Sequence, residues 1–379
     1  MHAPGGTVVD MRTASPAQPF TPAGVTPAGV TPPGSAAPSL GVPSLAAQYQ
    51  RYFPIGAAVE PETLDSQGDL LAAQVSSLVA ENAMKWEMIH PRAGNGPDSY
   101  DFTDADAIVD FARARGMKVR GHNLVWHKQV PGWVFKGQDG PATQTELLSR
   151  LQAHISSLLA HFRDRVYCWD VVNEALAERT GQWRTDSPWQ RIAGSGSAAP
   201  GIPAYIEKAF EYARAADPTV RLFYNDYGIE TGAKHEKAMS VVQALAGKGL
   251  VDGVGIQGHW SVFGPEPETV RRAIRGFASL GVEVQVTELD LSLYRWGDTS
   301  VLPEPRPDLL AEQAGRYASY FRVFREEAEA YRLTGVTFWG IADDHTWLDD
   351  FPVKGRKDWP LLFDIHHRPK DAFWKAAQW

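Results

Sequence analysis

Two glutamates in this sequence each close a short apolar stretch, and acid–base chemistry calls for such a pair. Glu174 ends V-Y-C-W-D-V-V-N-E (166–174), and Glu288 lies in V-E-V-Q-V-T-E-L-D (282–290). Paired carboxyl groups fit glycoside hydrolysis, in which one protonates the leaving oxygen and the other attacks the sugar or activates water. The alternative is structural: Glu174 would favour the positive N-terminus of a following helix, and Glu288 would pair with a neighbouring Arg or Lys.

Other apolar stretches also end on polar or aromatic residues, although polar groups are costly to bury. The further strand-end residues are Asn82, Lys85, Glu87, His122, Trp126, His127, Asn173, Asn225, Asp226, Gln257, His259, Asp290, Trp339 and Asp343. One site assembled from the ends of many strands would account for all of them together.

The elements that must position these residues alternate between two kinds of pattern. Eight apolar runs predict strands, at 53–59, 83–87, 118–127, 166–174, 220–227, 251–259, 282–290 and 335–343. Segments with apolar residues three or four apart lie between them and predict helices, among them 105–116, 147–162 and 205–216. This alternation indicates an α/β fold, a (β/α)₈ TIM barrel whose site lies at the C-terminal ends of the strands. A doubly wound sheet would explain one or two polar strand ends, but not easily so many.

The first 48 residues differ in kind from the rest. Their repeat T-P-A-G-V-T-P-A-G-V-T-P-P-G-S (21–35) has nothing with which to build a core. We therefore expect a flexible segment over 1–48 and a single catalytic domain over 49–379, the alternative being an ordered extension on the surface. The N-terminus shows neither the basic start nor the apolar stretch of a signal peptide.

Composition narrows the class of partner. A net charge of −8 and a pI near 5.8 argue against nucleic acid or an anionic membrane as a partner. The sequence has no apolar run long enough to span a membrane. Cys168 is the single cysteine, so it forms no disulfide within the chain, and we expect it to be a buried structural thiol. Neither a zinc-binding nor a nucleotide-binding pattern occurs in a suitable setting, so we expect no metal and no cofactor.

Seven motifs resemble, in order and spacing, those of glycoside hydrolase family 10, the endo-1,4-β-xylanases. They are G-H-N-L-V-W-H, D-V-V-N-E, L-F-Y-N-D-Y, G-I-Q-G-H, V-T-E-L-D, F-W-G-I-A-D-D-H-T-W-L and R-K-D-W-P-L-L-F-D. The resemblance runs from about residue 52 to the C-terminus. It implies a retaining enzyme that acts on xylan and xylo-oligosaccharides. We expect a monomer in an extracellular or periplasmic location, because the substrate is a polymer and the N-terminal segment is typical of exported enzymes. The alternatives are another β-glycoside as main substrate, or a carbohydrate-binding barrel that has lost catalysis.

The resemblance also implies roles for individual residues. Glu174 would be the acid/base and Glu288 the nucleophile. Asn173 would bond the sugar 2-hydroxyl, His259 would donate to Glu288, and Asp290 would orient its neighbours. Sugar hydroxyls on the non-reducing side would be bound by Glu81, Asn82, Lys85, His122 and Gln257, and pyranose faces would pack on Trp126, Trp339 and Trp347.

Structural alternatives stand beside several of these roles. Lys85 could instead pair with Glu81 or Glu87, His122 and His259 could be core residues, and Trp126 could belong to the core.

The proposed mechanism also sets a condition on the pKa of Glu174. The charge of Glu288 would have to hold that pKa high until the covalent intermediate forms. Two positions depart from the usual family pattern: Gly228 stands where Asn is commoner, and Asn123 where Thr is commoner.

Overall fold

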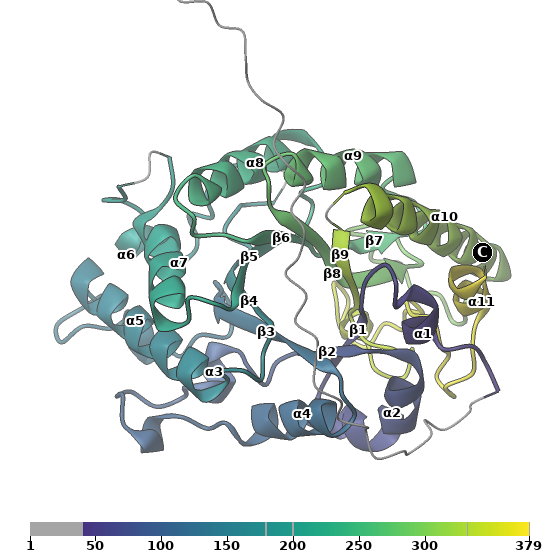
Figure 1. The fold of residues 1–379 in the computed structure, drawn as a ribbon, viewed down its shortest axis with the longest axis horizontal. Helices are drawn as coiled ribbons and strands as arrows, with labels where there is room; N and C mark the ends of the chain where they lie inside the picture. Colours follow the sequence, from purple (N-terminus) through teal and green to yellow (C-terminus); the bar gives the residue numbers. More distant parts are fainter. Residues whose placement is uncertain (1–40, 179, 199–200, 332, 379) are drawn as a thin grey trace, which may run out of the picture. The chain divides into compact units, whose positions relative to one another are not determined.

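Eight parallel strands close into a barrel in the computed structural model, which describes residues 41–378 except 179, 199, 200 and 332. The barrel strands are β1 (Ile55–Val59), β2 (Ser77–Ala80), β3 (Lys118–Val125), β4 (Cys168–Asn173), β5 (Arg221–Asp226), β6 (Gly253–Ile256), β8 (Glu283–Ser292) and β9 (Leu333–Phe338). Each pairs with the next, β6 pairs with β8, and β9 returns to β1 with Ile55 opposite Val336. The predicted (β/α)₈ barrel is confirmed (Figure 1).

Helices surround the strands (Figure 1). They are α1 (Leu45–Tyr49), α2 (Pro61–Gln74), α3 (Trp86–Ile89), α4 (Thr103–Ala114), α5 (Gln144–His161), α6 (Pro188–Ala193), α7 (Ala204–Ala216), α8 (Gly232–Ala246), α9 (Pro267–Ala278), α10 (Pro307–Ala330) and α11 (Asp371–Ala377). The helices predicted over 105–116, 147–162 and 205–216 are confirmed as α4, α5 and α7. A Thr143–Glu146 capping box begins α5, as a helix start requires.

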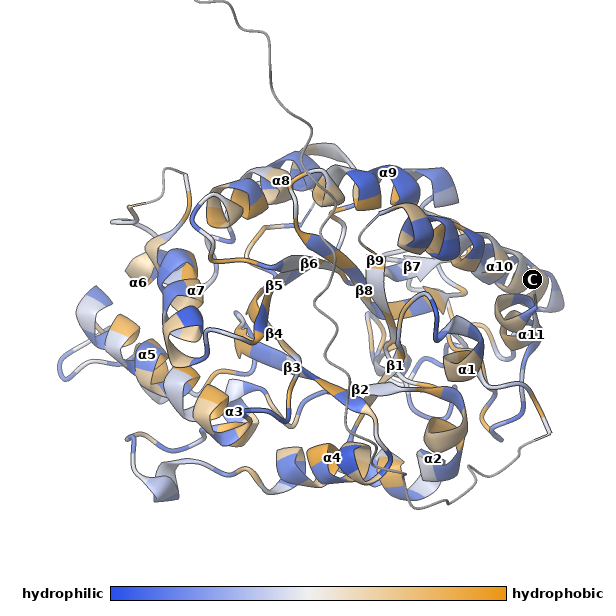
Figure 2. Ribbon diagram, in the orientation of Figure 1, coloured by the Kyte–Doolittle hydropathy of each residue, from blue (hydrophilic) through white to orange (hydrophobic). Residues whose placement is uncertain are grey.

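The outer helices bury one face. In α9 the buried residues are Val270, Ala273, Ile274 and Phe277, which recur at the spacing of one helical face. Figure 2 shows hydrophobic and hydrophilic residues alternating along α4, α8 and α9, whereas the strands carry many hydrophobic residues. The core therefore lies between the helices and the barrel wall as well as within the barrel.

The second predicted strand, 83–87, was wrong. The second strand is β2, six residues earlier, and Trp86 already begins α3. Only four residues form β2, too few to show a pattern, whereas Met84 and Trp86 are apolar because they pack into the core from the loop and from α3. Glu81 and Asn82 still follow a strand directly.

The predicted domain boundary also needs correction. Helix α1 begins at Leu45, inside the segment 1–48 that was expected to be flexible, and crosses the predicted boundary to end at Tyr49; both Leu45 and Tyr49 are buried in the core. The Tyr49 hydroxyl donates to the carbonyl of Ala376 near the C-terminus at 2.6 Å. The barrel domain thus begins by Leu45, while the predicted flexibility of residues 1–40 lies outside the described residues.

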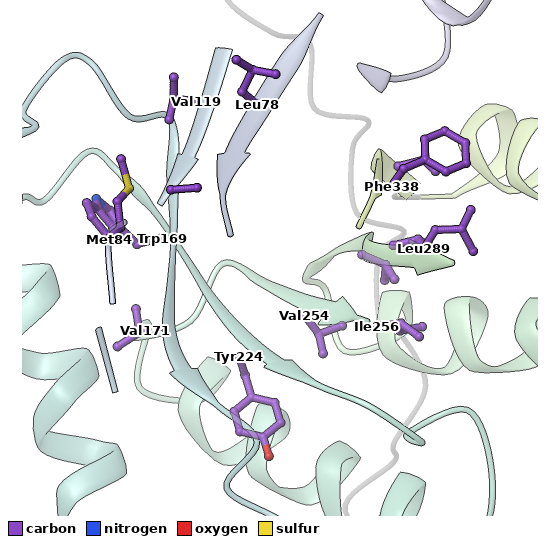
Figure 3. Packing of buried hydrophobic residues seen from close by; sticks show 14 of the residues in the cluster. Leu78, Met84, Val119, Trp169, Val171, Tyr224, Val254, Ile256, Leu289 and Phe338 are labelled. Atoms are coloured by element: carbon purple, nitrogen blue, oxygen red, sulfur yellow. The ribbon is translucent and has the colours of Figure 1, made fainter. Parts of the chain in front are cut away.

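A large aromatic side chain fixes the spacing of two neighbouring strands. Trp169 on β4 packs among the buried residues shown in Figure 3. A Cβ atom at Gly121 on β3 would lie 2.3 Å from the Trp169 ring, so this position requires glycine. In the same strands Arg120 Nε donates to Asp170 Oδ2 at 3.1 Å, which neutralises a charge inside the barrel.

The structure bears on two further expectations, the burial of Cys168 and the lack of a segment that could span a membrane. Cys168 is buried, and burial raises its pKa to about 11, so it is a structural thiol and not a nucleophile. Among the described residues no helix is both long and apolar enough to cross a membrane.

Two buried histidines predict a loss of stability in acid. His154 Nδ1 lies 3.3 Å from His90 Nδ1, and its ring stacks on Trp86 at a centroid distance of 3.8 Å. Burial lowers the pKa of His154 well below its usual value, and the neighbouring His90 lowers it further. The unfolded chain therefore takes up a proton that the folded protein does not, and the free energy of unfolding falls as pH drops below about 6.5.

His154→Phe keeps the stack on Trp86 and removes this proton. Below pH 6.5 we expect the free energy of unfolding to fall less steeply in this variant than in the wild type, by up to about 1.4 kcal/mol per pH unit. Urea unfolding between pH 7.5 and pH 5 measures both slopes. The exposed His366→Phe serves as the control, and equal slopes for His154→Phe and the wild type would contradict the expectation.

Candidate active site

The two glutamates are joined by a chain of amide side chains at the C-terminal ends of the strands. Gln257 Nε2 donates to Glu174 Oε1 and to Asn173 Oδ1, each at 3.1 Å. Asn225 Nδ2 donates to the same Asn173 oxygen at 2.8 Å and to Glu288 Oε1 at 2.7 Å. Glu174, Gln257, Asn173, Asn225 and Glu288 therefore form one connected group, named the amide chain below.

Glu174 is held by the backbone and by its side-chain partners. It follows the last residue of β4 with a φ of 55°, and its N–H donates to the Asn225 carbonyl at 2.9 Å. Trp126 Nε1 donates to Glu174 Oε2 at 2.9 Å, and His127 Nδ1 lies 3.9 Å from the same oxygen. A positive φ is unfavourable for a residue with a side chain, so the surroundings must hold this conformation.

The pKa of Glu174 differs from the expectation. Burial raises it, but His127, Trp126 and Gln257 together lower it further, so that it lies below the ordinary value. His127 contributes only when charged, and burial lowers its own pKa to about 4. The influences that lower the pKa of Glu174 and persist at neutral pH are the hydrogen bonds from Trp126 and Gln257 and the charge of Lys128. This arrangement favours a carboxylate ready to act as a base, not the protonated acid that was expected.

Glu288 lies in β8 between a neutral donor and a charged one. Asn225 donates to one carboxylate oxygen, and His259 Nε2 lies 3.0 Å from the other. His259 Nδ1 lies 2.8 Å from Asp290 Oδ2. Burial lowers the pKa of His259, but Asp290 and Glu288 raise it more, to about 10. The imidazolium therefore donates to both carboxylates and places a positive charge beside Glu288.

Several residues assigned to the non-reducing side lie together beyond β2 and β3. Lys85 Nζ donates to Asn82 Oδ1 at 2.9 Å and lies 4.5 Å from the centroid of the Trp126 ring. Glu81 Oε2 pairs with His345 Nε2 at 2.9 Å. No ion pair joins Lys85 to a carboxylate within the part of the chain that the structure describes, so the alternative pairing with Glu81 or Glu87 is not found. Burial lowers the pKa of Lys85, and the carboxylate of Glu288 opposes this most strongly.

Trp347 and Trp339 lie beside the His259–Asp290 pair, and Trp339 is itself buried against Ala58 and Val79. Trp347 Nε1 donates to Asp290 Oδ2 at 2.9 Å, and the Trp339 ring lies 6.1 Å from His259. His122 is buried, with Nδ1 3.0 Å from Asp170 Oδ2 and Nε2 3.2 Å from Asn123 Nδ2. Both of its nitrogens have partners within the protein, as in a core histidine, although its ring lies edge-on to that of Trp339 with 5.2 Å between the ring centroids.

Sequence reasoning missed the part that Asn225 plays. Its position at the end of β5 marked it as a site residue, but no role was assigned, and it proves to be a direct donor to Glu288 beside His259. Thr287 Oγ1 donates to Asn225 Oδ1 at 2.6 Å and so fixes which end of the amide faces the carboxylate. The bond from Trp126 to Glu174 was also missed, because tryptophan was considered only for its ring face.

The described residues contain no group of three or more His, Cys, Asp or Glu side chains that could hold a metal ion. In the acidic loop 343–359, Asp349 accepts from the Asp358 backbone N–H at 3.0 Å, and Asp350 from that of Gly355 at 2.9 Å. These carboxylates stabilise the loop itself.

Comparisons with known proteins give a consistent result. The family model described as glycosyl hydrolase family 10 matches residues 44–379. A β-1,4-xylanase of Dictyoglomus thermophilum is 47% identical over 332 residues, 87% of this chain and 89% of that protein. Endo-1,4-β-xylanase B of Paenibacillus barcinonensis is 45% identical over 335 residues, 87% and 96% of the two chains.

Solved structures agree with the sequence comparisons. A xylanase from Paenibacillus barcinonensis in complex with a conduramine derivative superposes with a TM-score of 0.83 at 44% identity, covering 89% of this chain and 99% of the other. A mutant with a glutamate replaced by alanine, in complex with xylotriose, gives a TM-score of 0.83 at 43% identity, covering 89% and 100%.

Proposed function

The chain belongs to glycosyl hydrolase family 10 and is a retaining endo-1,4-β-xylanase, and from this premise we propose that Glu174 and Glu288 carry out the double displacement. The observation that supports this assignment is the amide chain, which links these two carboxyl groups at the C-terminal ends of different strands. Catalysis in a barrel of this kind takes place at that face.

In the first step Glu288 attacks the anomeric carbon of a xylose residue. The bond from this carbon to the leaving oxygen breaks as a glycosyl ester bond to Glu288 forms, and Glu174 delivers a proton to the leaving oxygen. Asn225 and His259 hold the attacking carboxylate in place. Burial is the largest influence on the Glu174 carboxyl, and a sugar lying over it adds to that burial. Its pKa then rises, and the group takes up the proton that it donates.

In the second step Glu174 removes a proton from water, which attacks the same carbon and releases Glu288. The loss of negative charge on Glu288 in the covalent intermediate favours the ionised form of Glu174. Its hydrogen bonds from Trp126 and Gln257 favour the same form. The two inversions leave the product with the β-configuration of the substrate.

Substrate binding follows the same reasoning. Glu81, Asn82 and Lys85 would bind sugar hydroxyls on the non-reducing side, and tryptophan rings would pack on the pyranose faces, since such faces are apolar. The amide chain joins both glutamates within one barrel, so the proposed chemistry needs no second subunit, and we propose a monomer. An extracellular or periplasmic location rests on the polymeric substrate and on the composition of the N-terminal segment.

Early products of xylo-oligosaccharide hydrolysis, followed by NMR, test this function. We expect internal cleavage with the β-anomer formed first. An initial α-anomer would contradict the retaining mechanism, and binding without cleavage would favour a carbohydrate-binding barrel. Turnover of xylan against cellulose then separates a xylanase from an enzyme with another main substrate.

A further inference from the structure

An exposed tryptophan lies in the cleft beside the catalytic pair and has no role so far. Trp296, in the loop that follows β8, is 45% exposed although it is large and apolar. The cleft that it lines also includes Tyr227, His259, Asp290 and Phe351, and so reaches His259, which lies beside Glu288. A large apolar ring left open to solvent inside a cleft is typical of a ligand-binding surface.

The Trp296 ring ends a row of rings that starts at the catalytic centre. The ring centroids of His259 and Trp347 lie 4.9 Å apart, and those of Trp347 and Phe351 lie 5.0 Å apart. Phe351 lies 5.5 Å from Trp296, which faces Tyr227 at 6.3 Å with 27° between the ring planes. The row is therefore a continuous series of aromatic rings that runs from His259, a hydrogen-bond partner of Glu288, to Trp296.

The orientation of this ring is fixed by a bond across the cleft. Trp296 Nε1 donates to Glu178 Oε1 at 2.8 Å. Glu178 belongs to the loop that follows Glu174, whereas Trp296 follows the strand of Glu288, so the bond joins the loops of the two catalytic residues. An exposed ring held in this way loses little conformational freedom when a ligand stacks on it.

The position in the barrel shows which part of the substrate this surface meets. Glu81, Asn82 and Lys85, which are assigned to the non-reducing side, follow β2, and His122 lies in β3, its neighbour in the barrel. The cleft of Trp296 is lined by residues that follow β4, β5 and β9 and by residues in and after β8 and the short strand β7 (His259–Ser261), and by none of the described residues that follow β2 or β3. A substrate whose non-reducing side lies beyond β2 and β3 would therefore reach this cleft with the portion that leaves after the first step.

We propose that Trp296 stacks on a xylose ring of the leaving portion, beyond the sugar that lies next to the cleaved bond. The proposal rests on the proposed function, since it takes the polarity of the substrate from it. Trp296 is then a residue that sets the preference for longer chains, because only these reach it.

Kinetics on xylo-oligosaccharides of increasing length test the proposal. In Trp296→Ala, kcat/KM for xylohexaose should fall about tenfold, because the apolar sugar face loses its partner. Turnover of an aryl β-xylobioside, which carries no distal sugar, should change less than about twofold. Trp296→Phe should restore most of the loss, since it restores a ring. Tyr331→Ala removes an equally exposed ring, 46% against 45%, from the end of α10, and should change neither substrate.

Two results would overturn the proposal. An unchanged kcat/KM for xylohexaose in Trp296→Ala would mean that the ring does not contact the substrate. An equal loss on the aryl glycoside and on xylohexaose would mean that Trp296 only supports the catalytic loops. Failure of the proposed function itself looks different, because the wild-type enzyme would then cleave no xylo-oligosaccharide at all.

Discussion

Glu288→Ala is expected to reduce xylan hydrolysis by roughly four to six orders of magnitude, as removal of a covalent nucleophile does in other enzymes. Without Glu288 no glycosyl ester can form, and the face of the sugar from which it attacks is left open. Added azide should restore turnover by attacking the anomeric carbon from that face. The product is then the α-glycosyl azide, because a single displacement inverts the configuration.

Glu283→Ala is a matched control on the same strand. Glu283 pairs with Arg221 at 2.6 Å, at the other end of β8 from the cleft. Its loss should leave the rate close to that of the wild type. Near-wild-type hydrolysis by Glu288→Ala, or an azide product of β-configuration, would be incompatible with Glu288 as the nucleophile.

Glu174→Ala is expected to affect different substrates unequally. A xylose leaving group needs a proton as its bond breaks, so hydrolysis of xylan should fall by about 10²- to 10⁴-fold. An activated aryl group leaves without a proton, so the first step on aryl xylobiosides should be nearly unchanged and a burst of phenol should be visible. Stopped-flow measurement of that burst beside steady-state hydrolysis of xylan gives both values in one variant.

The comparison between substrates is its own control for Glu174→Ala. Damage to the fold would slow both reactions alike. An equal loss on xylan and on the aryl glycoside would therefore count against Glu174 as the acid. Azide should again add to the sugar in this variant, but now as the β-glycosyl azide, since it replaces water in the second step.

Strand periodicity and polar strand ends were enough to predict the barrel and its catalytic face. Strand β2 was not predicted because its four residues are too few to show a pattern. Met84 and Trp86 gave the pattern of a strand because they are apolar residues that pack into the core. Helix α1 escaped because Leu45 and Tyr49 are buried by contacts with distant parts of the chain, which the local composition does not show.

The candidate site was predictable in its residues but not in its contacts. Glu174 and Glu288 stand out by type and position, whereas the role of Asn225 depends on which strands are neighbours in the closed barrel. The low pKa of Glu174 depends on donors from β3 and from the end of β6, far apart in sequence. Electrostatics of this kind follow from three-dimensional proximity, which a motif does not contain.

The links of the amide chain are side chains that neither gain nor lose a proton in water. Asn173, Asn225 and Gln257 are joined to one another by hydrogen bonds. A change of acidity can therefore act on the two carboxyl groups at the ends and on the imidazolium beside Glu288, but it leaves the connection between them intact. The side chains that hold the catalytic geometry are therefore not the groups that change protonation. The enzyme can change the charge of either glutamate during turnover while the amide chain keeps the other in position.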